Sequence, residues 1–437
     1  MTDPQMAPAD DPLAARRVAL SVLDRVLRAR QPFDETLTGH GDFLRLEPRD
    51  RAFVRLLVAT TLRRLGEIDA ALGRLMDKPL TPRAHLVRGV LRLAVAQLAF
   101  LGTPAHAAVD TAVGLAATLE SGAYKALVNA VLRRVAREGD GLWQGADRLR
   151  LNVPGWLWES WVSTYGEDVA RAIAAAHLVE APLDITVRND AAPWAERLQG
   201  RLLPSGTVRR AAGGRIEELP GYAEGAWWVQ DAAAALPARL LGDVAGLRVV
   251  DLCAAPGGKT LQLAAAGARV TAVDVSAKRL RRVAENLKRT GLAAELIAAD
   301  GAAWRPDSPP DAVLLDAPCS ATGTLRRHPD IAWLKSADDV ERLVAVQARL
   351  LDSTIAMVKP GGLVVYAVCS LQPQESHERV AAVVARGAVR REPLTPADVP
   401  GLPEAVSPDG DLRTLPSMWP DWSGLDGFYA ARLRRIS

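Results

Sequence analysis

The sequence predicts an α/β protein in which an all-helical region precedes a doubly wound parallel sheet. Three observations support this fold class. In residues 1–140, apolar side chains recur at helical spacing, and no two-residue alternation competes with them. From Leu247 onward, short apolar strands alternate with helices, as in repeated βαβ units. Three of these strands lead into acidic residues, and the first is followed by a glycine-rich turn.

The helical region contains a series of amphipathic segments. Thr81-Pro82 marks one helix start, since proline is favoured in the first turn. The expected helices cover Val18–Leu27, Asp50–Leu65, Arg83–Leu101, Ala105–Leu119 and Tyr124–Arg137. Their arginines can face RNA or simply cover a solvated helix face, and the sequence leaves both readings open.

The middle of the chain has a mixed pattern. A linker rich in Gly and Asp covers Glu138–Arg148. A helix is then expected over Trp156–His177, with short strands at Leu183–Arg188 and Ala226–Val229. We therefore predict a helical domain over residues 1–140, a small α+β subdomain over 146–236 and an α/β domain over 237–437.

The α/β domain begins with a buried strand. The expected strands are Leu247–Leu252, Arg269–Val273, Ala294–Ala298, Asp311–Leu315, Leu363–Val368 and a closing strand at Gly427–Leu433. Helices are expected over Lys259–Ala266, Ser276–Gly291 and Ala337–Val358, the second capped by Ser276 and ended by Gly291. Ligands of such sheets bind beyond the carboxyl ends of the strands.

Composition excludes several classes of protein. The 437 residues are 49% hydrophobic and 24% charged, which rules out a disordered chain, a collagen and a disulfide-stapled miniprotein. The net charge of +3 neither requires nor excludes a nucleic-acid partner. The N-terminus is acidic and broken by proline, so no signal peptide is expected, and no apolar run is long enough for a membrane span. Three cysteines indicate a reducing compartment, the cytoplasm.

The first strand runs into a cofactor-binding turn. Small residues and glycines in this turn let a ligand approach the backbone. The turn residues are Cys253, Ala254, Ala255, Pro256, Gly257, Gly258 and Lys259. Asp274 ends the second strand, where an acidic residue usually binds ribose hydroxyls, and Asp300 follows the third strand, where it can reach an adenine edge. The turn lacks both the phosphate-loop and the G-x-G-x-x-G pattern, so an adenosine ligand without phosphates fits best.

Two cysteines meet the same sheet edge. The fourth strand leads into Asp316-Ala317-Pro318-Cys319, and the fifth leads into Cys369-Ser370. Because neighbouring parallel strands deliver their ends to one edge, both thiols are expected beside the cofactor. A disulfide between them is disfavoured in the cytosol, and no His or Cys spacing supplies a metal site. Cys253 lies within the cofactor turn, so a packing or backbone role is expected for it.

These motifs resemble those of the RNA cytosine-5 methyltransferases. The resemblance rests on DLCAAPGGKT, DAPCSATGTLRRHPDIAWL and YAVCS. The helical N-terminus resembles the antitermination factor NusB, and that pairing is typical of bacterial small-subunit ribosomal RNA methyltransferases of the Sun/Fmu type. The resemblance implies a Rossmann-like S-adenosylmethionine-dependent methyltransferase domain behind an all-α NusB-like domain and a small α+β insert. It also adds Asp316 to the cofactor-binding residues.

The chemistry of cytosine explains why a thiol is needed. C5 is a poor nucleophile, and adding a thiolate to C6 pushes electron density onto C5. Asp316 is placed to contact N3 of the base and stabilise the adduct. The resemblance makes Cys369 the nucleophile and Cys319 the residue that assists product release. Here Val368 replaces a common Thr and Gln374-Glu375-Ser376 replaces a common Glu-Glu-Asn, which leaves the hydrogen bonds around the thiols open.

The expected substrate is a cytosine of 16S ribosomal RNA, free or in a small-subunit assembly particle, taken from a single strand or flipped out of its stack. Arg326, Arg327 and His328 follow the Pro-Cys loop and are candidate RNA contacts, with a surface loop clamp as the alternative. We expect a monomer without membrane association. Two alternatives stay open: methylation of transfer RNA, and a catalytically silent RNA-binding assembly factor.

Overall fold

The computed structural model describes residues 11–436, which form two compact units. Unit 1 comprises residues up to Glu159 together with His328–Leu334, and unit 2 comprises Ser160–Arg327 and residues from Lys335 onward. The first ten residues of the stretch in which no signal peptide is expected lie outside the described residues. The division into three domains stays a prediction.

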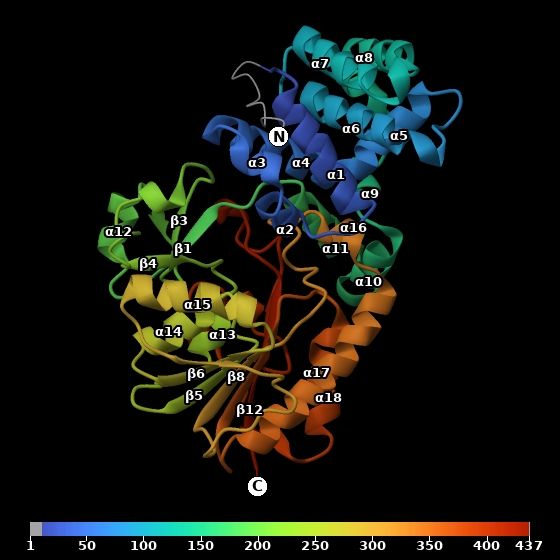
Figure 1. Cartoon of the computed structure of the whole chain (residues 1–437). Helices are drawn as coiled ribbons and strands as arrows, with labels where there is room; N and C mark the ends of the chain where they lie inside the picture. Colours follow the sequence, from blue (N-terminus) through green and yellow to red (C-terminus); the bar gives the residue numbers. More distant parts are fainter. Residues whose placement is uncertain (1–10, 437) are drawn as a thin grey trace. The chain divides into compact units, whose positions relative to one another are not determined.

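Unit 1 is all-helical, as predicted (Figure 1). Its longer helices are α1 (Ala14–Leu27), α4 (Pro48–Arg63), α5 (Leu65–Leu75), α6 (His85–Ala99), α7 (Ala105–Ala117) and α8 (Lys125–Glu138). Shorter helices are α2 (Phe33–Thr38), α3 (Gly41–Arg45), α9 (Arg148–Leu151) and α16 (Ile331–Leu334). Helix α10 (Gly155–Tyr165) crosses the unit boundary. One apolar core joins the longer helices α1 and α4 to α8, and it includes the fully buried Val22, Leu57 and Leu132.

The segment His328–Leu334 packs within unit 1, although it follows the Pro-Cys loop in the chain. The Phe33 backbone N–H donates to Asp330 Oδ2 at 2.9 Å, and Trp333 Nε1 donates to the Leu62 carbonyl at 2.8 Å. Trp333 and Leu334 also pack against the helical core. Sequence order alone would assign these residues to the α/β domain.

Unit 2 begins with a small α+β part. The predicted single helix over Trp156–His177 is wrong, because the chain breaks into α10 and α11 (Glu167–His177) at Gly166. Gly166 has φ +82°, a left-handed conformation that glycine adopts without a steric penalty. The small sheet that follows is antiparallel, in the order β2 (Arg201–Leu202), β3 (Val208–Arg210), β1 (Leu183–Val187), β4 (Trp227–Val229), with α12 (Ala192–Arg197) inserted after β1.

The large sheet has the order β10-β12-β9-β8-β5-β6-β7, and β11 pairs with β12. Its parallel strands are β5 (Arg248–Leu252), β6 (Arg269–Asp274), β7 (Glu295–Ala298), β8 (Ala312–Asp316) and β9 (Leu363–Val368). Its antiparallel strands are β10 (Val389–Arg391), β11 (Leu412–Thr414) and β12 (Phe428–Arg435). The sheet is therefore mixed and not wholly parallel. The connection from β11 to β12 holds a 3-10 turn at Pro420–Trp422 and lacks the α-helix that a parallel crossover usually contains.

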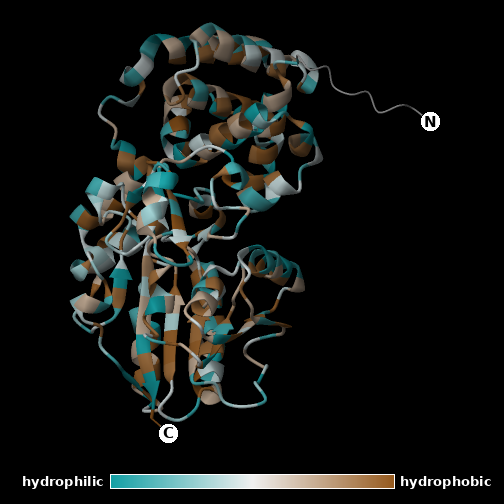
Figure 2. Ribbon diagram, turned by 90° about the vertical axis from the view of Figure 1, so that its left-hand side faces the viewer, coloured by the Kyte–Doolittle hydropathy of each residue, from teal (hydrophilic) through white to brown (hydrophobic). Residues whose placement is uncertain are grey.

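Helices cover both faces of the large sheet (Figure 1). Helices α13 (Leu236–Arg239), α14 (Gly258–Ala265) and α15 (Ala277–Thr290) lie on one side, and α17 (Ala337–Met357) and α18 (His377–Val384) lie on the other. Figure 2 shows hydrophobic residues along the strands between these layers. The predicted fold class, helices followed by an α/β sheet domain with a small α+β insert, is confirmed.

Strand order reverses between β5 and β8, because the chain first proceeds from β5 to β6 and β7 and then returns to the other side of β5. This switch point is where ligands of open α/β sheets bind. No helix within residues 11–436 combines the length and apolarity that a membrane crossing requires.

Candidate active site

The predicted cofactor turn follows β5 directly. Gly257 precedes α14 with φ +105°, and a Cβ placed on it would lie 3.1 Å from Val283 Cγ1. Both facts favour glycine at this position. The backbone N–H of Ala255 donates to Asp274 Oδ2 at 3.2 Å, which ties the turn to the end of β6.

A hollow of about 260 Å³ opens at the carboxyl ends of β5, β6, β7 and β8. Cys253, Asp274 and Asp300, three of the predicted cofactor residues, line this hollow together with Pro318. The Asp274 side chain is buried and also accepts the Ser276 N–H at 2.9 Å, whereas Asp300 is exposed. Its position at the switch point, its acidic rim and its small-residue turn fit an adenosine-containing donor.

An ion pair joins the cofactor turn to β8. Lys259 Nζ lies 2.7 Å from Asp316 Oδ2 and 5.1 Å from the centroid of the Phe428 ring. Burial lowers the pKa of Lys259, but the charge and hydrogen bond of Asp316 outweigh burial and leave that pKa raised; the charge of Cys369 also raises it. The positive charge of Lys259 therefore interacts with both Asp316 and Cys369.

The two predicted thiols meet at the ends of adjacent strands. Asp316 of β8 pairs with Ala367 of β9, and Cys319 and Cys369 follow these residues. Their Sγ atoms lie 3.4 Å apart, and both side chains are half-buried. This distance corresponds to a contact between two free thiols and not to a disulfide.

The protein sets the acidity of these thiols unequally. Burial raises the pKa of Cys253 to about 12, helped by the charges of Asp316 and Asp274. The hydrogen bond with Cys369 raises the pKa of Cys319 well above its usual range, as do burial and the charges of Cys369 and Glu375. Cys253 and Cys319 are therefore held as neutral thiols.

A buried carboxylate lies behind the thiols. Glu375, at the end of a 3-10 turn over Pro373–Glu375, is fully buried. It accepts hydrogen bonds from Ser320 and Ser370, the residues that follow the two cysteines, and from Gln347 of α17. Gln374-Glu375-Ser376 is a variant of a common Glu-Glu-Asn, but the sequence alone predicts no role for Glu375 in the site, because its partners Ser320 and Gln347 lie far away in the chain.

The three predicted RNA contacts lie in different surroundings. The Arg326 side chain is buried and donates to the Ser423 carbonyl. Arg327 contacts Asp231 Oδ2 at 2.6 Å and Asp426 Oδ2 at 3.0 Å. In unit 1, His328 Nδ1 lies 3.2 Å from Asp34 Oδ2, and although burial raises the pKa of Asp34, His328 and Arg55 lower it to about 2. Both arginines thus bind groups of the protein itself, and their role in RNA binding stays a prediction.

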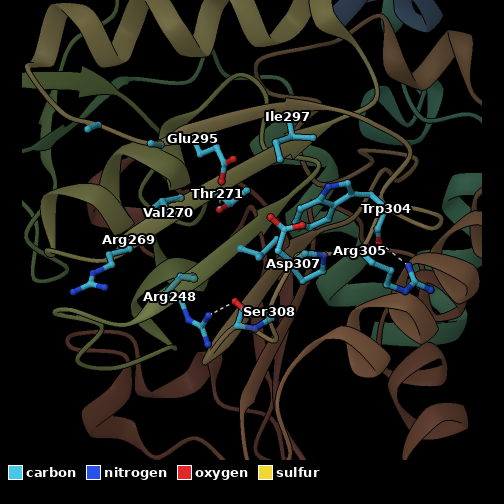
Figure 3. A pocket seen from close by; sticks show the side chains of 16 residues that line it. Arg248, Arg269, Val270, Thr271, Glu295, Ile297, Trp304, Arg305, Asp307 and Ser308 are labelled. Atoms are coloured by element: carbon cyan, nitrogen blue, oxygen red, sulfur yellow. Dashed lines mark hydrogen bonds between the residues drawn. The ribbon is translucent and has the colours of Figure 1, made fainter.

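A second hollow, of about 500 Å³, lies at the other end of the parallel strands (Figure 3). It is lined by residues at the start of the strands, such as Arg248 and Arg269, and by Trp304 and Asp307 from the connection between β7 and β8. Arg248 donates to Ser308 within it. Since the cysteines follow the opposite ends of the strands, this hollow is separate from the candidate site.

Comparison with known proteins gives two sequence-family matches. Residues 238–434 match the model described as "16S rRNA methyltransferase RsmB/F", and residues 13–137 match that of the NusB family. Ribosomal RNA small subunit methyltransferase B of Pseudomonas putida is 38% identical over 97% of this chain and 98% of its own length. The protein of the same name from Vibrio cholerae is 38% identical over 78% of this chain and 82% of its own.

Two solved structures share the fold. The protein PH0851 matches with a TM-score of 0.74 at 21% identity, over 99% of this chain and all of its own. A methyltransferase homologue from Pyrococcus horikoshii matches with a TM-score of 0.54 at 25% identity, over 67% of this chain and 96% of its own. These matches agree with the helical and α/β parts described above.

Proposed function

Because the chain belongs to the ribosomal RNA small subunit methyltransferase B family, we propose that it methylates C5 of a cytosine in 16S ribosomal RNA through a covalent cysteine adduct. It is an S-adenosylmethionine-dependent methyltransferase, and that cofactor supplies an electrophilic methyl group when bound. The reaction takes place in the cytoplasm, and the substrate is the naked RNA or a small-subunit assembly particle. The protein acts as a monomer.

The observation that carries the proposal is the pair of thiols 3.4 Å apart beside the Lys259–Asp316 ion pair. Cys369 is the nucleophile. Cys319 and Cys253 are held as neutral thiols, whereas Cys369 interacts with the positive charge of Lys259. These differences support the order of roles that the sequence motifs imply.

The residues act in sequence on the cytosine. The Cys369 sulfur forms a bond to C6, and the electron pair of the C5–C6 double bond moves towards C5 and N3. Asp316 contacts the N3 side of the ring, where a proton on its carboxyl group hydrogen-bonds the negative charge that develops at N3, and Lys259 adds a positive charge beside it. C5 then gains the methyl group, loses its proton to a base, and the C6–S bond breaks to return the Cys369 thiolate. Cys319, in contact with that sulfur, assists this last stage.

The cofactor side of the site uses the hollow at the switch point. We assign the ribose contact to Asp274 and the adenine edge to Asp300, because both line the hollow that Cys253 and Pro318 share. Residues 254–257 connect the end of β5 to α14, which begins at Gly258, and we assign the remaining backbone contacts to them. Pro318 precedes Cys319, so the hollow extends to the strand end that bears one of the thiols.

Two experiments test the proposal. Bisulfite sequencing of ribosomal and transfer RNA from a strain lacking the gene is expected to show the loss of one methylated cytosine in 16S ribosomal RNA. Complementation with the wild-type gene, but not with Cys369→Ala, restores that signal. A loss confined to transfer RNA would mean that the enzyme methylates transfer RNA instead. No loss at all would indicate an assembly factor without catalysis.

The second experiment separates the thiols. Cys369→Ala abolishes turnover and forms no adduct, whereas Cys319→Ala accumulates a covalent RNA–protein adduct on denaturing gels. The opposite pattern would exchange the two assignments.

A further inference from the structure

Glu375 occupies an unusual position for a charged side chain. It is fully buried in unit 2, and such carboxylates occur in proteins only when they are paired or thoroughly hydrogen-bonded. Its Oε1 accepts the Ser320 N–H at 2.8 Å and the Gln347 Nε2–H at 3.0 Å. Its Oε2 accepts the hydroxyls of Ser320 and Ser370. These four donors fill the acceptor sites of an ionised carboxylate.

The donors come from both cysteine-bearing strand ends. Ser320 follows Cys319, and Ser370 follows Cys369, so one carboxylate binds the neighbour of each thiol. The link continues on the other side of Cys319, since Gln347 also donates to the Pro318 carbonyl at 3.0 Å. A direct backbone bond of 3.0 Å from Gly323 N–H to the Cys369 carbonyl joins the same two loops.

Glu375 is itself fixed by its surroundings. The Tyr366 hydroxyl of β9 donates to the Glu375 carbonyl at 2.7 Å, and Gln347, Ser320 and Ser370 are fully buried. Each of these side chains makes at least one buried hydrogen bond to Glu375, and such a network holds one arrangement more firmly than separate surface contacts would. Through Ser320 and Ser370, the Glu375 carboxylate therefore helps to fix the Sγ–Sγ distance of 3.4 Å.

We propose that Glu375 is a positioning residue of the methyltransferase reaction, which locks the Cys319 and Cys369 loops together and reserves the nucleophilic role for Cys369. This inference rests on the proposed function. The electrostatic part has its own support, because the negative charge of Glu375 is among the causes that raise the pKa of Cys319. A thiolate at Cys319 would compete for C6 of the base, and the buried charge opposes its formation.

The main test uses Glu375→Gln, which keeps the size of the side chain and removes its charge. The remaining amide oxygen can still accept the Ser320 N–H, and the amide group can donate to the serine hydroxyls, so the fold is expected to survive. We expect kcat to fall about 10- to 100-fold, with little change in KM for RNA, because misplaced reacting groups affect the chemical step. Glu378→Gln, an exposed glutamate in the first turn of α18, is the matched control and is expected to keep the wild-type kcat.

A second readout does not depend on turnover. In a Cys369→Ala background, the pH midpoint of Cys319 alkylation by iodoacetamide is followed by peptide mass spectrometry. Glu375→Gln is expected to move this midpoint to lower pH by on the order of one unit, since a neighbouring negative charge is removed. Glu375→Asp keeps the charge but shortens the reach, so it is expected to lower kcat while leaving the midpoint closer to that of Glu375.

The outcomes are distinguishable. A wild-type kcat for a folded Glu375→Gln variant, or an unchanged alkylation midpoint, overturns the inference. If the wild-type protein itself forms no 5-methylcytosine and no adduct, the proposed function fails instead. The alkylation comparison still decides whether Glu375 controls the acidity of Cys319.

Discussion

Replacing Arg327 with methionine separates a structural arginine from an RNA contact. In unit 2 its guanidinium donates to Asp231 Oδ2 at 2.6 Å, to Asp426 Oδ2 at 3.0 Å and to the Pro182 carbonyl at 3.1 Å. The side chains of Asp231 and Asp426 are 4% and 3% exposed, so water can compensate little for a lost cation. The variant therefore leaves two buried carboxylates without this partner.

The expected destabilisation follows from that burial. Removing one partner of a buried ion pair typically costs about 3–5 kcal/mol, because the remaining charge stays desolvated. For a domain of this size, such a loss corresponds to a fall in melting temperature of about 6–20 °C. Arg209, bidentate to Asp184 at 2.6 Å, also lowers the pKa of Asp231 through its charge and therefore offsets part of the loss.

The effect has a defined pH dependence. Burial raises the pKa of Asp231, but the charge and hydrogen bond of Arg327 outweigh burial and leave that pKa lowered. In the wild type, this group therefore stabilises the fold above its unfolded pKa, and the contribution is lost as pH falls through the lowered folded pKa. Without Arg327, burial raises the pKa of the carboxylate above the unfolded value, so the native state takes up protons as pH falls from 7 towards 4. The difference in free energy of unfolding between wild type and variant therefore becomes smaller as pH falls from 7 towards 4.

Calorimetry of both proteins at pH 7 and pH 5 measures the effect, with binding to a 16S ribosomal RNA fragment recorded below both melting transitions. Arg281→Met, an exposed arginine on α15, is the control and is expected to change stability by about 0.5 kcal/mol or less. Unchanged melting of Arg327→Met combined with weakened RNA binding would refute this reasoning and restore Arg327 as an RNA contact.

Further predictions concern three other positions. Burial raises the pKa of Asp251 to about 7, so the folded state loses stability as pH rises from about 4 to 7. Asp251→Asn removes this ionisation. Urea unfolding at pH 8 is expected to show the variant to be about 2–4 kcal/mol more stable than the wild type. Gly257→Ala forces a residue with a Cβ into φ +105°, and titration calorimetry is expected to show about 10-fold weaker binding of S-adenosylmethionine. An affinity equal to that of the wild type would show that alanine is not strained at this position. In unit 1, a Cβ on Gly66 would lie 1.7 Å from the Leu151 carbonyl oxygen, so Gly66→Ala is expected to lower the melting temperature of the helical unit by several degrees, and unchanged melting would show that the backbone moves freely there.

The parts predicted well from the sequence are those that one strand end or one helix face determines. Asp274, Asp316, Cys319 and Cys369 each lie at or just after the end of a parallel strand, and parallel strands bring such ends to one edge. The buried stripe of α1 was visible for the same reason, since helical spacing is local. Neither inference required knowledge of distant contacts.

The sequence was less informative where the structure depends on a contact with a distant part of the chain or on the conformation of a single residue. The break at Gly166 depends on a positive φ that a glycine permits but does not require. The apolar residues of β12 predicted a strand correctly, but its antiparallel direction depends on its pairing with β9, which lies far away in the chain. The carboxylates that bind Arg327 lie far away in the chain, so the sequence does not show these contacts, and RNA binding by this segment stays a prediction.

Glu375 illustrates why the hierarchy between two identical thiols cannot be derived from strand-end positions. Both cysteines follow parallel strands, both are half-buried, and each precedes a serine. The difference between the thiols comes from their surroundings. Ser320 donates both its N–H and its hydroxyl to Glu375, whereas Ser370 donates only its hydroxyl. On the other side, the positive charge of Lys259 interacts with Cys369. Cys319 is thus tied more closely to a negative charge, and Cys369 faces a positive one. In the proposed mechanism, two chemically equal residues have different roles because the fold places opposite charges around them.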